Sequence, residues 1–354
     1  MTVHGGDVRE VAEQLGIDPS EILDFSANIN PRGLPPRALE RLSQGLLGMY
    51  PDRSARRLRK ALSRKLRVPP EAIVVGPGAE ALLSPILRCL QASRALVPVP
   101  AFGEYRRVCA QENIEFIPFL LERAECFRLP VDRFCQRVEG VNVVLVNNPH
   151  NPSGSLLDAE DVRRILEAVT SRGGTLVLDE AFVDYAPHAS LTADAASRAG
   201  LIVIRSLTKF YGCPALRVGY AVARPETVEE IVSYLPAWPI TQLAADALAE
   251  AVEDRACAEA SLRENDVERE WLRDALTAFG HTVLPSAANY LLIELGEGML
   301  PAAALRASLI ESHRILIRNC DSYEGLAPSR FVRVAVRARE ENCRLVEALR
   351  HANR

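Results

Sequence analysis

The segment Ser206-Leu207-Thr208-Lys209-Phe210-Tyr211-Gly212 follows the apolar run Leu201–Arg205 and places a lysine close to two hydroxyl groups. The chain has three lysines and 39 arginines, so its cationic side chains are almost always arginine. The other two lysines, Lys60 and Lys65, lie among arginines, where arginine would serve equally well. Arginine cannot supply a primary amine. A lysine at position 209 of a chain that otherwise uses arginine therefore indicates that a primary amine is needed there. Taken alone, these residues also allow a plain surface charge at this position.

The run Leu201–Arg205 is one of several apolar, β-branched runs that alternate with helical patterns. The helical patterns lie near 79–92, 103–112 and 158–171, and Asp158 is a suitable N-cap for the last one. This alternation predicts an α/β fold with a mostly parallel sheet and helices on both faces. Ligands in such folds bind at the carboxyl ends of the strands. The other expected strands are Ile73–Gly76, Ala95–Pro98, Ile114–Phe119, Val141–Asn147, Thr175–Asp179 and Val218–Ala223.

The pattern changes after about residue 225 and predicts a second, smaller α+β unit. Long helical stretches near 225–235, 240–253 and 256–279 come first. Short strands at Asn289–Leu295, Ile315–Arg318 and Phe331–Val336 follow, and a helix near Arg339–His351 comes last. We therefore expect a large domain over residues 46–258, and a small domain formed by residues 1–45 together with 259–354.

The composition excludes several classes of protein. A net charge of -4 gives no reason to expect nucleic acid or an anionic membrane as a partner. The eight cysteines show no C-x-x-C pair and no clustering with histidine, which argues against a zinc site and favours reduced thiols. No apolar run approaches the roughly 20 residues that span a bilayer. We expect a soluble, cytoplasmic protein.

Three further polar segments follow expected strands. Val75-Gly76-Pro77-Gly78-Ala79-Glu80 opens a helix whose amides would hold a phosphate, although a plain turn has the same pattern. Asn147-Asn148-Pro149-His150-Asn151 would present the Asn151 amide to a ligand at the sheet edge, although a tight turn with no such role has the same pattern. Leu176-Val177-Leu178-Asp179-Glu180 places two acids at a strand end, where burial demands hydrogen bonds or an ion pair.

An amine, a carboxylate, a carboxamide and a phosphate cradle at strand ends are what pyridoxal 5′-phosphate requires. The amine would bond to the cofactor aldehyde, and the carboxylate would keep the pyridine nitrogen protonated. The amide would donate to the ring oxygen, and the cradle would fix the phosphate. We therefore expect this cofactor, with Lys209 and Asp179 as the catalytic pair.

The run from Tyr50 to Arg217, with later elements to Arg333, resembles the fold-type-I pyridoxal-phosphate enzymes of the histidinol-phosphate aminotransferase group. That resemblance implies a large domain with a mostly parallel sheet and a smaller α+β domain. Within the group, four segments are similar to the threonine-phosphate decarboxylases. These segments are His4-Gly5-Gly6, Asp24-Phe25-Ser26-Ala27-Asn28-Ile29-Asn30-Pro31, Arg205-Ser206-Leu207-Thr208-Lys209-Phe210-Tyr211 and Phe331-Val332-Arg333-Val334-Ala335-Val336.

The resemblance also implies roles for individual residues. Lys209 would carry the cofactor, Asp179 would pair with its pyridine nitrogen, and Asn151 would reach the ring oxygen. Phe102 would stack on the ring, and Tyr50 would reach across a homodimer interface to the partner's cofactor; an ordinary core tyrosine is the alternative for Tyr50. The remaining cofactor contacts would come from Gly78, Ala79, Glu80, Ser206, Thr208 and Arg217.

A phosphorylated amino-acid substrate would need cations and amides around its two anionic groups. Arg333 is at the family's carboxylate-binding position, and Arg337 is a weaker candidate on the same strand face. The expected substrate contacts are His4, Gly5, Asn28, Asn151, Arg318 and Arg333. Related aminotransferases have tyrosine where this chain has Phe182, a change that the decarboxylases tend to share.

These features favour decarboxylation of O-phospho-L-threonine to (R)-1-amino-2-propanol O-2-phosphate, a step of cobalamin biosynthesis. The main alternative is an aminotransferase that acts on histidinol phosphate or an aromatic amino acid. A cofactor-sensing regulator would need a DNA-binding domain before residue 40, where there is neither room nor basic charge. A catalytically inactive scaffold conflicts with the intact set of Lys209, Asp179 and Arg217.

Overall fold

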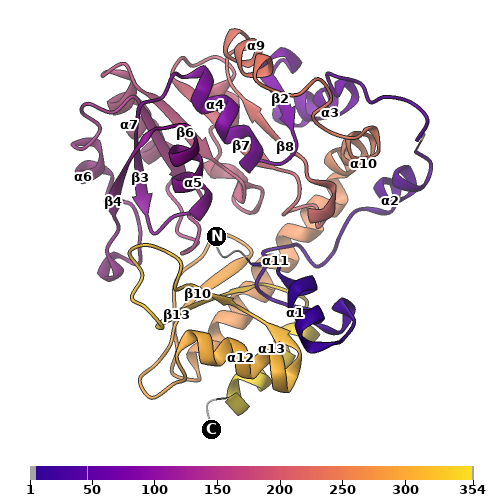
Figure 1. Cartoon of the computed structure of the whole chain (residues 1–354), viewed down its shortest axis with the longest axis vertical. Coiled ribbons are helices and arrows are strands. Elements are labelled where there is room, and N and C mark those ends of the chain that lie inside the picture. The colour runs from indigo at the N-terminus through magenta and orange to yellow at the C-terminus, as the bar shows by residue number, and fades with distance from the viewer. Residues whose placement is uncertain (1–4, 46, 353–354) are drawn as a thin grey trace.

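The computed structural model describes residues 5–45 and 47–352. Two units lie one above the other, with helix α11 (Arg255–Thr277) running between them (Figure 1). The upper unit contains a seven-stranded sheet with the order β2-β8-β7-β6-β5-β3-β4. Its strands are β2 (Ile73–Gly76), β3 (Arg94–Val99), β4 (Glu115–Leu120), β5 (Val143–Asn147), β6 (Thr175–Asp179), β7 (Leu201–Ser206) and β8 (Gly219–Val222).

The large sheet is mostly parallel, as the sequence predicts. Strands β4, β3, β5, β6 and β7 run parallel to their neighbours in that set. Strand β8 is antiparallel to both β7 and β2. The carboxyl ends of β5, β6 and β7 are therefore adjacent, and Asn147 pairs with Asp179 in the register. Because β8 runs the other way, its first residue, Gly219, lies opposite both Ser206 and Gly76 at this same edge.

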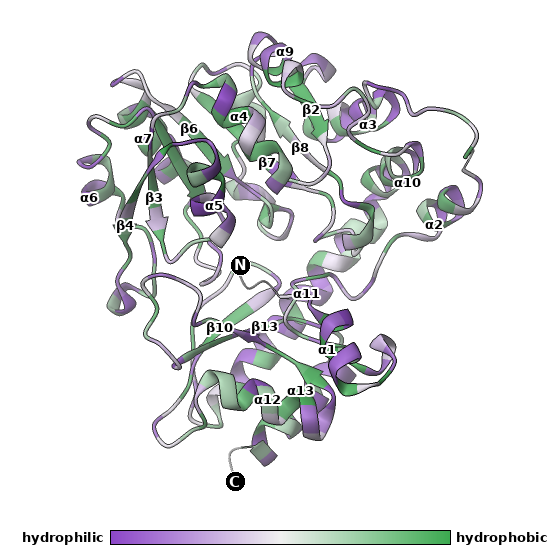
Figure 2. Cartoon of the chain, viewed as in Figure 1, coloured by the Kyte–Doolittle hydropathy of each residue, from purple (hydrophilic) through white to green (hydrophobic). Residues whose placement is uncertain are grey.

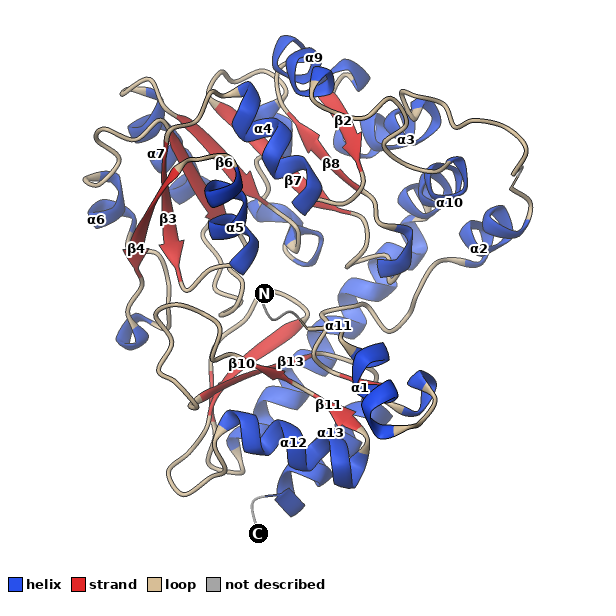
Figure 3. Cartoon of the chain, viewed as in Figure 1, coloured by secondary structure: helices blue, strands red, loops and turns tan. Residues whose placement is uncertain are grey.

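Helices cover both faces of the large sheet (Figure 3). Alternate strand residues face opposite sides, so Val144 and Val146 belong to one buried cluster and Val143 and Leu145 to the other. The strands are hydrophobic along much of their length, and hydrophilic residues concentrate on the helices and loops (Figure 2). One face packs against α4 (Leu83–Cys89), α5 (Gly103–Gln111) and α9 (Pro225–Ser233). The other packs against α3 (Arg56–Leu66), α6 (Val131–Cys135), α7 (Ala159–Thr170), α8 (Thr192–Ala195) and α10 (Gln242–Glu253).

The lower unit combines a four-stranded antiparallel sheet with helices. The sheet order is β12-β13-β10-β9, from β12 (Arg318–Asn319), β13 (Phe331–Ala335), β10 (Tyr290–Glu294) and β9 (Thr282–Val283). A separate pair joins β1 (Leu23–Asp24) in parallel to β11 (Ile315–Leu316). The N-terminal segment therefore packs with the C-terminal unit. The helices of this unit are α1 (Val8–Leu15), α11, α12 (Ala302–His313) and α13 (Arg339–Ala352).

The expected domain limits at 45/46 and 258/259 stay predictions. Helix α2 (Pro36–Ser43) lies before the first limit but packs against α10 of the large domain. Helix α11 spans the second limit. Within the described residues, no helix combines the length and the apolar character needed to cross a membrane. The same residues contain no group of three or more His, Cys, Asp or Glu side chains placed to hold a metal ion.

Candidate active site

A cavity of about 250 Å³ lies at the carboxyl edge of the large sheet, and residues of the smaller unit also line it. It gathers nearly all the site residues expected from the sequence. Those that line it are Gly5, Asn28, Gly78, Ala79, Glu80, Phe102, Asn151, Asp179, Ser206, Thr208, Lys209, Arg217, Arg318 and Arg333. The strand ends supply one side of the cavity, and the N-terminal segment and β12–β13 supply the other.

Lys209 lies in the turn after β7, with its side chain partly exposed to the cavity. Its backbone is fixed because the Lys209 carbonyl accepts hydrogen bonds from the amides of Asn30 and Gly212, at 3.1 and 3.3 Å. Burial lowers the pKa of the Lys209 amine from 10.5 to about 8, and the positive charges of Arg333 and Arg217 act in the same direction. The amine is therefore neutral, and nucleophilic, far closer to neutral pH than an ordinary lysine.

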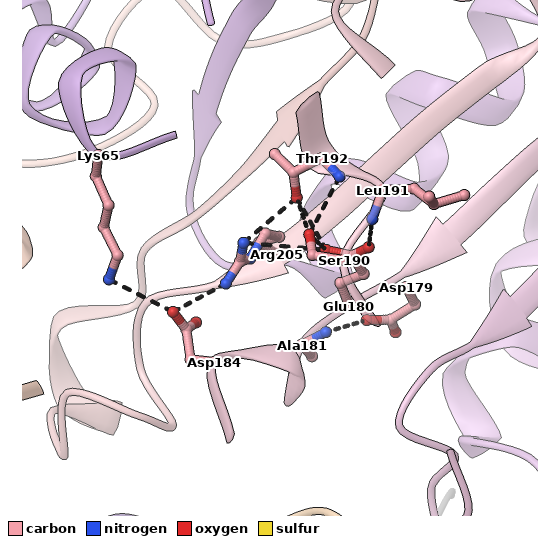
Figure 4. A network of polar contacts seen from close by, with 9 residues as sticks. All are labelled: Lys65, Asp179, Glu180, Ala181, Asp184, Ser190, Leu191, Thr192 and Arg205. Atoms are coloured by element: carbon pink, nitrogen blue, oxygen red, sulfur yellow. Dashed lines mark hydrogen bonds and ion pairs between the residues drawn. The ribbon is translucent and has the colours of Figure 1, made fainter. Parts of the chain in front are cut away.

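Asp179 ends β6, and both of its carboxylate oxygens accept hydrogen bonds. The Ala181 amide donates to Oδ1 at 2.9 Å, as Figure 4 shows, and the Tyr105 hydroxyl donates to Oδ2 at 2.5 Å. Burial raises the pKa of Asp179, and the two hydrogen bonds oppose that rise. Tyr105 was not expected from the sequence as a site residue.

The segment around Gly78 and Arg217 has the shape of an anion cradle. Gly78 has φ of +108°, and a Cβ there would lie 3.0 Å from Nη2 of Arg217. Ser206 and Thr208 lie beside it, with their hydroxyl oxygens 2.8 Å apart. Among the described residues, the Arg217 guanidinium has no hydrogen-bond or acidic partner. A cation, two hydroxyls and a glycine turn before a helix thus converge where a phosphate can bind.

Asn151 and Arg333 contact each other directly. Nη1 of Arg333 donates to Oδ1 of Asn151 at 2.6 Å, and Nη2 donates to the Ser26 carbonyl at 3.0 Å. The Tyr323 hydroxyl also donates to Oδ1 of Asn151, at 3.1 Å. Because Oδ1 of Asn151 accepts both of these hydrogen bonds, the orientation of the amide is fixed, and its nitrogen is the atom that can donate to a ligand. Tyr323 lines the cavity and was not expected from the sequence as a site residue.

The remaining cavity wall comes from the N-terminal segment and β12. Asn28 is buried, and its Oδ1 has no hydrogen-bond partner among the described residues. Gly5 packs so closely that a Cβ there would lie 2.1 Å from the Ser26 carbonyl oxygen. The guanidinium of Arg318 donates to the Ser322 hydroxyl at 2.7 Å. Polar groups thus line the side of the cavity opposite the strand ends.

Among the described residues, one expected site residue, Tyr50, does not line the cavity. Tyr50 is 80 % exposed and stacks on Trp238, with ring centroids 4.6 Å apart, so the core-tyrosine alternative is wrong. Its role toward a partner's cofactor stays a prediction. His4 lies outside the described residues. The weaker candidate Arg337 is turned away from the cavity, because its guanidinium pairs with Glu341 at 2.7 Å.

Lys65 has more specific contacts than its position among arginines suggests. Its ammonium lies 2.5 Å from the Tyr211 hydroxyl and 3.5 Å from Asp184. Asp184 also pairs with the buried Arg205 at 2.8 Å, and Arg205 in turn lies 3.9 Å from Glu180, so Figure 4 shows a charge network from Lys65 through Asp184 and Arg205 to Glu180. Glu180 follows Asp179 and Arg205 precedes Ser206, so the network ties together the two segments that carry the expected catalytic pair.

The family model for aminotransferase class I and II matches residues 20–349. The chain belongs to this family. It is 34 % identical over 363 residues to threonine-phosphate decarboxylase of Salmonella typhimurium, covering 99 % of this chain and 96 % of that protein. It is 29 % identical over 359 residues to histidinol-phosphate aminotransferase of Methanococcus aeolicus, covering 98 % and 94 %. Histidinol-phosphate aminotransferase from Sinorhizobium meliloti, solved in complex with pyridoxal-5′-phosphate, superposes with a TM-score of 0.88 at 24 % identity, covering 98 % and 94 %.

This protein is therefore a fold-type-I enzyme that depends on pyridoxal 5′-phosphate. The residues present fit that group, because the Gly78 turn and the Arg217 guanidinium suit its phosphate and the Lys209 amine suits its aldehyde. Asp179 would hold the pyridine nitrogen, and Asn151 Nδ2 would donate to the ring oxygen. Phe102, which lines the cavity, would lie against the ring. The cofactor, once bound, supplies an aromatic ring that accepts electrons from a bond at the substrate Cα.

Proposed function

We propose that this enzyme removes CO2 from O-phospho-L-threonine and releases (R)-1-amino-2-propanol O-2-phosphate, a step of cobalamin biosynthesis. The observation that carries the proposal is the full-length similarity to a threonine-phosphate decarboxylase, at 34 % identity, together with a cavity that suits a substrate with two anionic groups.

Arg318 and Arg333 are paired across adjacent antiparallel strands and both line the cavity. Both side chains are about 5 % exposed, so their charges lie in a region of low dielectric, where they attract anions strongly. Two guanidinium groups side by side suit a molecule that carries a carboxylate and a phosphate a few bonds apart. We assign the carboxylate to Arg333, which Asn151 and Ser26 orient, and the phosphate to Arg318 with Asn28 and Gly5 nearby.

In decarboxylation, the bond between Cα and the carboxylate carbon breaks, CO2 leaves and a proton is added at Cα. Arg333 would set the direction of the carboxylate and so determine which bond at Cα breaks. Lys209 would add the proton, because this residue lines the cavity and burial lowers the pKa of its amine to about 8.

Phe182 lines the cavity beside Asp179 and packs edge-on against Tyr290, with ring centroids 5.0 Å apart. A phenyl ring has no hydroxyl, so the donor that related aminotransferases place here is missing. The cofactor ring oxygen would then depend on Asn151 alone among the expected donors. This difference supports a reaction other than transamination.

We also propose that the enzyme acts as a homodimer. Leu47, Met49 and Tyr50 are 84, 67 and 80 % exposed, and Tyr50 stacks on the half-exposed Trp238. Exposed apolar residues clustered in this way are typical of a protein interface. Sedimentation equilibrium should give twice the chain mass, and a Tyr50→Ala variant should bind the cofactor less tightly if this side chain completes the partner's site.

The test of the reaction is product analysis with O-phospho-L-threonine, with and without 2-oxoglutarate. We expect CO2 and aminopropanol phosphate in equal amounts without any oxoacid. The Lys209→Met variant is the control for uncatalysed loss of CO2. Turnover that requires 2-oxoglutarate and releases no CO2 would refute the proposal.

An aminotransferase is the second candidate, favoured by the 29 % identity to a histidinol-phosphate aminotransferase over nearly the whole chain. Such an enzyme would use the same Lys209 to move a proton from Cα. Histidinol phosphate carries one anionic group, so it would leave one of Arg318 and Arg333 without an anion. Incubation with histidinol phosphate and 2-oxoglutarate, followed by assay for glutamate, tests this candidate directly.

A further inference from the structure

Tyr105 is a buried residue on the first turns of α5 whose hydroxyl reaches the end of β6. It is 2 % exposed, and its hydroxyl donates to Oδ2 of Asp179 at 2.5 Å. The only other donor to this carboxylate among the described residues is the Ala181 amide. Within the same residues no lysine or arginine forms an ion pair with Asp179. The negative charge of Asp179 is therefore supported by one side chain and one backbone group.

Two proton arrangements are available to Asp179 and a pyridine nitrogen that faces it. The proton can lie on the nitrogen, which leaves an ion pair, or on the carboxylate, which leaves two neutral groups. Burial favours the neutral arrangement because charges are costly in a low dielectric. Each hydrogen bond donated to the carboxylate favours the charged arrangement. A hydrogen bond to an ionised acceptor is about twice as strong as a hydrogen bond between neutral groups.

The surroundings of Tyr105 keep it a donor. Burial, and then the charge of Asp179, raise the pKa of the Tyr105 hydroxyl well above its ordinary value, so the hydroxyl retains its proton. Its ring packs edge-on against Phe102, with centroids 5.7 Å apart, and its amide donates to the Phe102 carbonyl at 3.1 Å. The same helix start thus presents the expected stacking ring and a hydroxyl fixed on Asp179.

We propose that Tyr105 is a positioning residue that keeps Asp179 ionised and oriented, and so keeps the cofactor's ring nitrogen protonated. It acts through Asp179 and touches neither the substrate nor the bond that breaks. The proposal rests on the cofactor of the family and not on the choice between decarboxylase and aminotransferase. It therefore stands or falls separately from the proposed reaction.

The experiment compares the holoenzyme with Tyr105→Phe and with a matched control, Tyr185→Phe. Tyr185 is also buried, but its hydroxyl has no partner among the described residues, so its loss removes a hydroxyl without touching Asp179. Each protein is loaded with pyridoxal 5′-phosphate that carries 15N at the ring position. The 15N chemical shift distinguishes a protonated from an unprotonated ring nitrogen.

We expect a protonated nitrogen in the wild type and in Tyr185→Phe, and a mainly unprotonated nitrogen in Tyr105→Phe. The kcat of Tyr105→Phe should fall about tenfold to a hundredfold with little change in KM, since the loss of one hydrogen bond to a charged group is of that size. A fully protonated nitrogen in Tyr105→Phe would overturn the proposal, and so would an equal change in Tyr185→Phe.

A second variant keeps the proposal testable if Tyr105→Phe does not fold. 4-Aminophenylalanine at position 105 keeps the ring and a donor to Asp179, but an aromatic amine donates more weakly than a phenol. The 15N shift should then move from the wild-type value toward that of an unprotonated ring nitrogen. An unchanged shift would show that the donor at position 105 does not act on the ring nitrogen.

Discussion

The lowered pKa of Lys209 predicts how fast the apoprotein captures its cofactor at each pH. Only the neutral amine can attack an aldehyde, so the rate follows the neutral fraction. With a pKa of about 8, about one lysine in ten is neutral at pH 7, whereas an ordinary lysine with a pKa of 10.5 has about one in three thousand neutral. Burial of Lys209 should therefore speed capture at pH 7 by about 300-fold.

The assay is stopped-flow mixing of apoprotein with pyridoxal 5′-phosphate between pH 6 and pH 10, followed by absorbance. The rate of cofactor capture should rise about tenfold per pH unit below about pH 8 and should level off above that pH. A simple alkyl amine measured in parallel corrects for the cofactor's own ionisations. In Arg333→Met the midpoint should move to higher pH, because the second largest cause of the lowered pKa is removed. A midpoint near pH 10 in the wild type would show that Lys209 is hydrated, and would refute the argument from burial.

Four further predictions follow from the site. Between about pH 8 and 10.5, Lys209 keeps its proton in the unfolded chain but not in the native apoprotein. The free energy of unfolding of the wild-type apoprotein, relative to that of Lys209→Met, should therefore rise by about 3 kcal/mol from pH 8 to pH 10.5, as measured by urea titrations. Asp179→Asn should still bind the cofactor, seen by absorbance, but lose about a hundredfold or more in kcat because an amide cannot hold the ring nitrogen protonated. Gly78→Ala should weaken cofactor binding about tenfold or more in fluorescence titration, because φ of +108° strains a Cβ beside Arg217, whereas Gly16→Ala, at φ of +66° with nothing within 4 Å, should leave the affinity unchanged. Arg333→Lys should raise KM for the amino acid at least about tenfold in steady-state assays with unchanged cofactor affinity, because lysine cannot keep both existing contacts and a forked grip on a carboxylate.

The strands of the large sheet could be predicted closely because burial on both faces leaves a continuous apolar signal. Ile73–Gly76 and Thr175–Asp179 were expected at the limits that the structure has, and the Asp158 side chain caps α7 by accepting from the Asp161 amide at 2.8 Å. The sequence could not predict the direction of β8 in the sheet, because the residue pattern of a short strand is the same for a parallel and an antiparallel neighbour. That direction matters, since it brings Gly219 and Arg217 to the cavity edge.

The site residues that follow strands were predictable because parallel strands end at one edge of a sheet. Tyr105 was missed because its contact with Asp179 depends on how α5 packs on β6, which no local pattern records. Tyr323 was missed because it lies in an irregular loop between β12 and β13, where no periodicity indicates which side chains face inward. For Tyr105, its place three residues after the expected stacking residue Phe102 was the one available signal.

The pairing of β1 with β11 has a consequence for biosynthesis. Leu23 leaves the ribosome long before its partner Ile315 is made. Residues 23 and 24 therefore stay without this pairing until residues 315 and 316 have been synthesised, and the neighbouring cavity wall that holds Ser26 and Asn28 cannot be completed before then. Ribosome-bound nascent chains that stop before residue 315 should consequently bury the central sheet but leave the catalytic chamber open to solvent and to proteases.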